Sequence, residues 1–314
     1  MHSRRFDTPL SPFSPDALQS ELAVALSPEA RTWLQVARDK ILGTKSVEGA
    51  VSALLLTSAM ARRKLGQAVL PYQPEGTDWR VDQAGRLLLL LTLRTRVPVS
   101  DWSDVLFSIY RQFDENEKIV LVRALDWLSS HHELNGIAHE TARTNDVNLF
   151  AALALNNAYP VKYFNERSFH QLVLKALFLD LNIESVRGLP LRQSAELTQL
   201  CADLVQERLL AERQVPESIW LGMRFRYLSD SSKDTYLGYV FSESDAHQYY
   251  ALLALANNGA QDCPDAFWQR LAARQSQSLT SEVQQLIDHL LTASRFGHSQ
   301  SLSSLTGYFN HEIF

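Results

Sequence analysis

The sequence predicts an all-α protein, built as an irregular α-solenoid or helical array of the HEAT type. Apolar residues recur every three or four positions, as at Leu121, Leu125 and Leu128, which is the period of one helix face. Helix-capping residues precede several of these stripes. Short helical segments with tight turns between them also follow one another from about residue 101 to residue 154, as in stacked helical repeats.

Start signals indicate where the helices begin. Ser14-Pro15 and Ser27-Pro28 each place a capping hydroxyl before a proline at the first helical position. Residues 114–117 form a capping box with Asp in the first position, and residues 242–245 repeat this device before a Tyr- and Leu-rich segment. The apolar run of residues 87–93 is shorter than the roughly 20 residues of a membrane span, so we expect a buried helix there.

Breaks and loose ends divide the chain. Proline and glycine interrupt the helical pattern at residues 66–77, 97–98, 188–190 and 263–264. We expect flexible tails at residues 1–13, which are punctuated by proline, and at residues 296–314, which are rich in Ser, Gly and His. Within residues 223–241, apolar and polar residues first alternate, a turn-like segment follows, and aromatic residues come last, so a short β-hairpin is the alternative to a helix there.

Composition limits the class of protein. The chain has 314 residues, of which 46% are hydrophobic and 21% charged, and its formal net charge is -5. This balance argues against a nucleic-acid binder that relies on overall positive charge. Two cysteines, Cys201 and Cys263, form neither a disulfide framework nor a four-thiolate zinc site. Without an apolar signal region, we expect a cytoplasmic protein, with peripheral contact to the inner membrane left open.

No known cofactor or metal motif is present in the sequence. It contains neither of the two glycine-rich phosphate-binding patterns, and it has no GxSxG nucleophile elbow. No cofactor is therefore expected. His131, His132 and His139 alternate with glutamates, but Asn135-Gly136 separates them and HExxH spacing does not occur. We interpret this cluster as an exposed helix start rather than a metal site.

Polar residues next to apolar helices are the candidates for ligand binding. In the segment Arg143 to Asp146, Asn145 or Asp146 can cap the next helix, while Arg143 either pairs with a carboxylate or faces a ligand. Gln171 and Lys175 share one helix face, where they either recognise a carboxylate or phosphate or form a solvated pair. Asp203 and Glu207 are like charges four residues apart, which favours a nearby cation. The complete candidate set is Arg143, Asn145, Asp146, Tyr159, Gln171, Lys175, Asp203, Glu207 and Arg208.

The same segments resemble the EboA family of bacterial secondary-metabolite gene clusters. The resemblance covers about residues 28–220 and is strongest in the run from Phe169 to Phe178. It also rests on Arg143-Thr144-Asn145, Asn157 to Pro160, Tyr163-Phe164, Val186 to Leu189, Glu196-Leu197, Glu207-Arg208, Ala59 to Gly66 and Val81 to Arg86. Ala158 and His170 depart from the Pro and Asn that the family pattern leads us to expect.

The resemblance implies a domain division and a cellular context. Residues 14–220 would form the EboA-like helical domain, and residues 221–295 a helical C-terminal extension. EboA-type proteins are regarded as helical and have no established reaction. Their clusters also encode a prenyltransferase-like membrane protein, a sugar-phosphate cyclase-like enzyme, a TIM-barrel isomerase-like protein and metal-dependent hydrolase-like proteins. These clusters are implicated in making a small lipid-linked or cyclitol-like metabolite and, in cyanobacteria, in moving a sunscreen-pigment precursor to the periplasm.

Two hypotheses about function follow. In the first, the protein is a non-catalytic accessory or scaffold protein that binds a pathway enzyme, such as the membrane prenyltransferase, or a small anionic or cyclitol-like metabolite. In the second, it is an enzyme for an anionic intermediate. Arg143 and Lys175 would then hold the anion, Asp203 or Glu207 would act as acid or base, and Gln171 or Asn145 would orient the substrate. The absence of a catalytic motif favours the first hypothesis.

Overall fold

The computed structural model is helical throughout the part of the chain that it describes. The described residues are 15–71, 79–128, 132–258, 260, 262–275 and 280–295. Within these ranges no strand forms, and the extended pairing between Val69 and Arg80 is an isolated bridge. The all-α prediction is therefore confirmed for the described residues, whereas a solenoid arrangement of the helices stays a prediction. The predicted tails, residues 1–13 and 296–314, lie outside the described residues.

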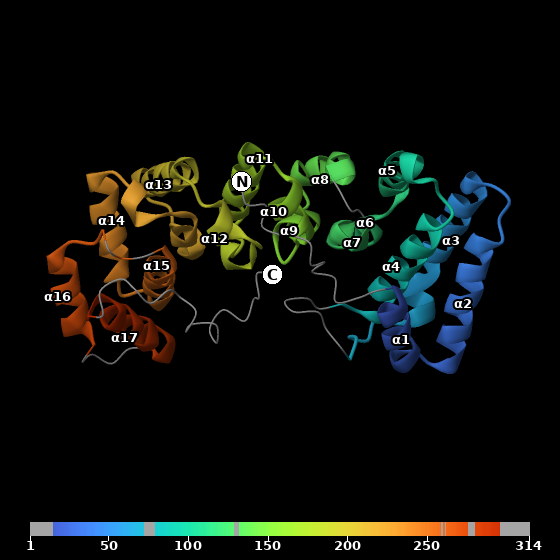
Figure 1. Cartoon of the computed structure of the whole chain (residues 1–314), viewed down its shortest axis with the longest axis horizontal. Helices are drawn as coiled ribbons and strands as arrows, with labels where there is room; N and C mark the ends of the chain where they lie inside the picture. The colour runs from blue at the N-terminus through green and yellow to red at the C-terminus, as the bar shows by residue number, and fades with distance from the viewer. Residues whose placement is uncertain are drawn as a thin grey trace, which may run out of the picture. The chain divides into compact units, whose positions relative to one another are not determined.

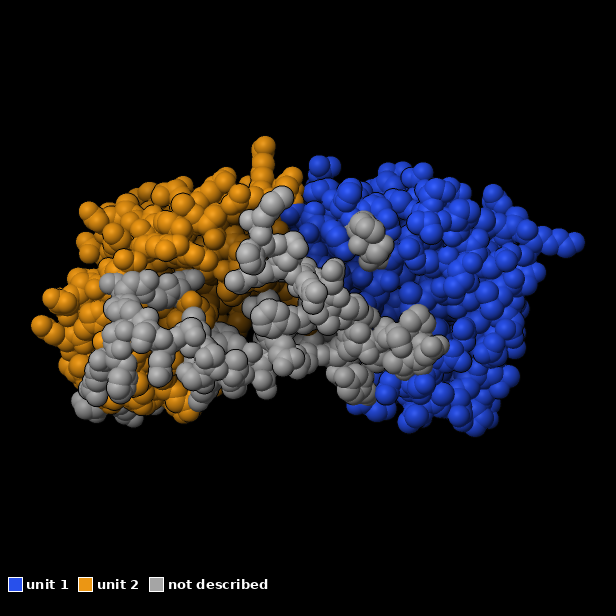
Figure 2. Space-filling view, viewed as in Figure 1, with its two compact units in different colours: residues 1–164, 314 blue, residues 165–313 orange. Residues whose placement is uncertain are grey.

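The helices form two compact units, which meet in the sequence between Phe164 and Asn165 (Figures 1 and 2). Unit 1 contains α1 (Pro15–Ala25), α2 (Pro28–Leu42), α3 (Val47–Leu65), α4 (Val81–Arg94), α5 (Trp102–Gln112), α6 (Glu115–Arg123), α7 (Leu125–Leu128), α8 (Asn135–Ala142), α9 (Val147–Ala154) and α10 (Tyr159–Tyr163). Two short 3₁₀ helices, η1 (Val99–Asp101) and η2 (His132–Leu134), connect some of them.

The core of unit 1 is built around α4. Helices α1, α2 and α3 all pack against α4, and α6 contacts it further along the chain. Residues 87–90 of α4 are at most 2% exposed, so the apolar run is a buried helix as predicted. A helix that is apolar on all sides is stable only when neighbours cover each side. The predicted capping box of α6 is also present, with Asp114 and Glu117 each bonded to the other's backbone N–H.

Unit 2 contains the remaining helices. They are α11 (Glu166–Phe178), α12 (Leu189–Arg192), α13 (Ala195–Leu210), α14 (Asp230–Val240), α15 (Asp245–Asn258), α16 (Asp265–Arg274) and α17 (Ser281–Arg295). Three 3₁₀ helices, η3 (Ile183–Ser185), η4 (Glu217–Gly222) and η5 (Phe225–Tyr227), lie between them. Helix α15 packs against η4, α14 and α17 and forms the centre of this unit, while α13 packs against η4 from a separate part of the chain.

The β-hairpin considered for residues 223–241 is wrong. This segment instead forms η5 and then α14. The Ser229 side chain caps α14 by accepting a hydrogen bond from the N–H of Ser232, and the turn-like residues after Ser229 belong to the first helical turn. Tyr236 and Val240 are buried four residues apart, which places both on one helix face. The predicted alternation of apolar and polar residues before Ser229 does correspond to an alternation of burial, since Met223 and Phe225 are buried and Arg224 between them is partly exposed.

A candidate site in the groove between α11 and α13

Helix α11 has one buried face and one face that is left open. Asn165 caps the helix by accepting a hydrogen bond from the N–H of Ser168. The predicted stripe of Phe169, Leu172, Val173 and Ala176 is buried, as its helical spacing requires. The other face bears Gln171, Leu174, Lys175 and Phe178, and the Phe178 ring is 63% exposed. The exposed ring is available to stack against a flat ligand.

Helix α13 likewise has one buried face and one open face. Ser194 caps it through the N–H of Leu197, and Leu197, Cys201 and Val205 are buried. Leu200 and Leu204 lie four residues apart on a second face and are only partly buried. This second apolar stripe faces the open face of α11.

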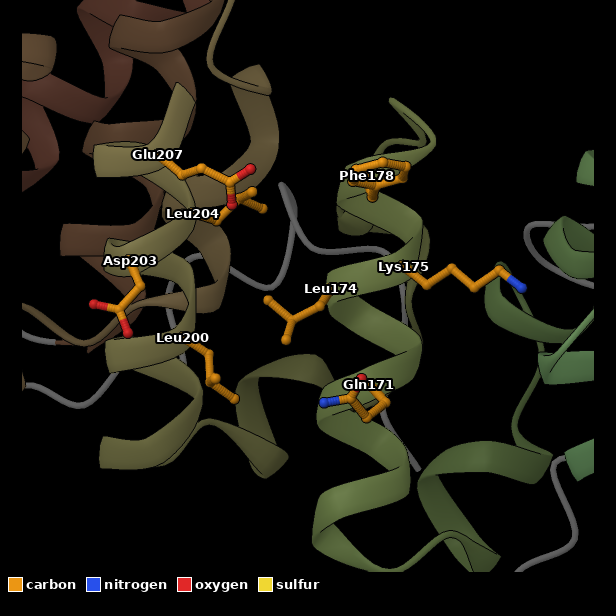
Figure 3. Close-up of a pocket in the computed structure, with 8 residues that line it drawn as sticks. All are labelled: Gln171, Leu174, Lys175, Phe178, Leu200, Asp203, Leu204 and Glu207. Carbon is orange, nitrogen blue, oxygen red and sulfur yellow. The ribbon is translucent and has the colours of Figure 1, made fainter. Parts of the chain in front are cut away.

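The two open faces line an open groove of about 360 Å³, formed entirely by residues of α11 and α13. Leu174, Leu200 and Leu204 point into the gap between the helices and form its apolar floor (Figure 3). Phe178 lies at one end of the groove. The Gln171 amide and the Glu207 carboxylate also point into the gap, so the groove combines an apolar floor with two polar groups (Figure 3).

The other two polar lining residues point away from the groove centre. The Lys175 side chain extends from the far side of α11, away from α13 (Figure 3). Its partial burial lowers the pKa of Lys175 below the usual lysine value. The Asp203 carboxylate accepts a hydrogen bond of 2.7 Å from the Gln199 amide on its own helix. Lys175 therefore extends away from the α13 carboxylates that line the groove.

Arg208 supplies a cation at the Phe178 end of the groove. Its guanidinium carbon lies 5.7 Å from the centroid of the Phe178 ring, within the range of a cation–π contact. Two like charges four residues apart, Asp203 and Glu207, led us to expect a cation nearby, and Arg208 is close in sequence to both. In the structure, Arg208 contacts the Phe178 ring of the opposite helix.

His170 joins the N-terminal ends of α11 and α13 beside the groove. The ring is 1% exposed, and its Nε2 lies 3.2 Å from the Ser194 hydroxyl. Carboxylate oxygens of Glu166 and Glu196 lie 3.7 and 3.8 Å from Nε2 and Nδ1, respectively. The residue that departs from the expected family pattern is thus a packing and hydrogen-bonding element of this helix pair.

Four of the predicted site residues belong to unit 1. Asp146 caps α9 by accepting a hydrogen bond of 2.8 Å from the N–H of Leu149, which is the structural alternative considered for this segment. Arg143 and Asn145 are exposed next to it. Tyr159 is fully buried, and this burial raises the pKa of its hydroxyl. Tyr159 is therefore inaccessible to a ligand from solvent in this structure.

The site thus collects Gln171, Lys175, Asp203 and Glu207 in one groove, with Arg208 at its end. Sequence reasoning missed the apolar lining residues, although the signal was present. Leu174 with Phe178, and Leu200 with Leu204, each form an apolar pair four residues apart, outside the stripe that enters the core.

The histidine cluster shows no metal-binding arrangement in the described residues. His131 lies outside these residues, and His132 is exposed. The His139 ring stacks on Phe164 with 4.7 Å between ring centroids. Where side chains are described, no group of three or more His, Cys, Asp or Glu residues is arranged to hold a metal ion.

The groove lies in the part of the chain that matches a known protein family. The family model described as "Metabolite traffic protein EboA" matches residues 15–224, which include all of α11 and α13. The chain belongs to the EboA family. Neither a curated protein nor a solved structure matches it. Among the described helices of this EboA family member, none is long and apolar enough to cross a membrane.

Proposed function

We propose that this protein is a non-catalytic accessory protein of a secondary-metabolite pathway, which binds a small metabolite in the groove between α11 and α13. The single observation that carries the proposal is the groove itself, with its apolar floor, exposed aromatic ring and inward-pointing Gln171 and Glu207. An apolar cleft with a few oriented polar groups is the usual form of a small-molecule site. The family description, which refers to metabolite traffic, supports the same role.

The groove suggests the chemistry of its ligand. Leu174, Leu200 and Leu204 favour an apolar body, and the Phe178 ring favours a flat one that can stack on it. The Glu207 carboxylate only accepts hydrogen bonds when ionised, so a ligand with a hydroxyl or N–H group complements it. Of the two ligand classes considered above, this chemistry suits a hydroxyl-bearing, cyclitol-like one better than an anionic one, because Lys175 points out of the groove.

The enzymatic alternative has weaker support. It requires Lys175 to hold an anion next to Asp203 or Glu207 as acid or base. Within unit 2, Asp203 bonds to Gln199, and Lys175 extends away from α13. General acid–base catalysis needs such groups within hydrogen-bond reach of one reacting atom.

The binding role can be tested with N-phenylnaphthylamine, a neutral fluorescent probe with apolar rings and one N–H group. We expect saturable binding to the full chain and a loss of affinity of about tenfold or more in Leu204→Gln, which places an amide on the floor of the groove. Leu191→Gln is the matched control, because Leu191 is a 59% exposed leucine of α12 outside the groove. Equal affinity of both variants, or no binding by the wild type, would contradict the proposal.

The absence of catalysis can be tested separately. Native mass spectrometry of the protein after incubation with an extract of cells that carry the pathway should reveal a small-molecule adduct that Leu204→Gln lacks. We expect the released molecule to have the same mass before and after incubation with the purified protein. Conversion to a product of different mass would support the enzyme hypothesis instead. Co-purification of a pathway enzyme without an adduct would favour a scaffold.

A further inference from the structure

A buried tryptophan and a histidine are joined by a hydrogen bond in unit 2. Trp220 of η4 is 1% exposed, and its indole N–H donates to Nδ1 of His247 on α15 at 3.0 Å. An indole nitrogen can only donate, so Nδ1 must offer a lone pair. His247 is therefore neutral in this arrangement and carries its proton on Nε2.

The surroundings of His247 favour this neutral form. The Tyr239 ring of α14 lies 4.7 Å from the imidazole ring, and the Trp220 ring lies 5.9 Å from it. The charged group that faces His247 from η4 is Glu217, which favours protonation, whereas Tyr239 is the titratable group that faces it from α14. Burial has the larger effect and lowers the pKa of His247 below the usual value of 6.5.

We propose that the Trp220–His247 hydrogen bond is a proton-sensitive latch, which holds η4 against α15 only while His247 is neutral. Protonation puts an N–H on Nδ1, directly opposite the indole N–H. Two donors then face each other, and the buried indole loses its acceptor. Because Trp220 has almost no access to water, its N–H cannot replace the lost partner without movement of η4 or α15.

The latch is connected to the groove through the packing of η4 on α13. A Cβ atom built on Gly222, the last residue of η4, would lie 2.7 Å from Sγ of Cys201, so the backbone of η4 lies directly against this α13 side chain. Just after η4, the N–H of Arg224 donates to the Thr198 hydroxyl of α13 at 3.0 Å. Protonation of His247 should therefore loosen the support of α13 and weaken ligand binding. This regulatory consequence, unlike the latch, rests on the proposed function of the groove.

Proton–nitrogen NMR spectra of the full chain test the latch directly. The six tryptophans give at most six indole N–H signals, and Trp220→Phe identifies the one from Trp220. We expect this signal to shift as the pH falls from about 7.5 to about 5, with a midpoint below the ordinary histidine value of about 6.5. Trp102 is the internal control, because its indole donates to the carbonyl of Leu128, which does not titrate. A Trp220 signal as constant as that of Trp102 would overturn the proposal.

His247→Gln provides a second test, since glutamine offers an acceptor oxygen that does not titrate. The free energy of unfolding of the wild type should begin to fall as the pH drops below about 6.5, because His247 is protonated first in the unfolded chain. The fall should be smaller in His247→Gln. The same dependence on pH in both proteins would contradict the latch.

N-phenylnaphthylamine separates the latch from its consequence for the groove. If both proposals hold, probe affinity falls severalfold between about pH 7.5 and pH 5 in the wild type, and falls less in His247→Gln. A titrating Trp220 signal with no probe binding at any pH supports the latch and contradicts the proposed function. Probe binding that does not follow the Trp220 titration contradicts the regulatory step alone.

Discussion

Nη1 of Arg86 lies 2.7 Å from Oδ2 of Asp82 inside unit 1, where the two side chains are only 5% and 4% exposed. The Arg86 Nε also donates to the carbonyl of Ser58 on α3 at 3.2 Å. A charge pair buried between α3 and α4 is tolerated because each charge has the other as a partner. Removing one partner leaves the other charge buried and uncompensated, which is costly.

Asp82→Ala should therefore lower the free energy of unfolding by about 3–5 kcal/mol, measured by urea denaturation of the full chain. Glu140→Gln is the control, because Glu140 pairs with Arg111 at 3.6 Å while both side chains are well exposed. Its effect should be small, as for most surface pairs. Equal losses in the two variants would show that the buried pair has no special role.

Asp146→Ala tests whether this candidate ligand residue is a helix cap. Loss of the bond to the Leu149 N–H should cost about 1 kcal/mol of stability, while Asp146→Ser, which keeps a capping oxygen, should cost less. Thermal unfolding of both variants measures the difference. Unchanged stability in Asp146→Ala would show that the hydrogen bond to the Leu149 N–H contributes nothing to the helix.

Gly222→Ala tests the close approach of η4 and α13. The new methyl group would lie 2.7 Å from Sγ of Cys201, so we expect a loss of about 1–3 kcal/mol from overpacking. The second change Cys201→Ala removes this sulfur and should restore part of the loss. Gly238→Ala is the opposite control, because a Cβ there meets nothing within 4 Å, and alanine should stabilise the α14 interior by up to about 1 kcal/mol.

The two thiols should be unreactive in the folded protein. Burial raises the pKa of Cys201 and of Cys263 to about 12, so almost no thiolate exists at about pH 8, and the thiolate is the reactive form. Ellman's reagent should therefore label neither thiol of the native chain, and both thiols in urea. Rapid labelling of native Cys201 would imply that η4 opens away from α13.

Local signals in the sequence were enough to predict several helix starts and buried faces in the described residues. Ser27, Asp114 and Asp146 all cap helices, as their positions before apolar segments predicted. The stripe from Phe169 to Ala176 is buried because residues three and four apart share a helix face. The segment around Ser229 shows the limit of such signals, since the same residues are compatible with a turn and with a capped helix.

The candidate site was only partly predictable. The helical period placed Gln171 and Lys175 on one side of α11 and kept Asp203 and Glu207 close together on α13. It did not reveal that Leu174 faces Leu200 and Leu204 across a gap between the two helices. An apolar residue beside a buried stripe has the same local pattern whether a neighbouring helix covers it or leaves it open.

The sequence by itself determined the all-α class, the helix caps, the core stripes and the membership of the EboA family. These properties depend on residues close together in the chain and on a long run of matching positions. The tertiary structure alone decided which polar side chains enter the groove, that Tyr159 is buried, and that the Trp220 indole meets His247. These relationships join residues from different helices, and the packing of whole helices sets the distance and direction between such side chains.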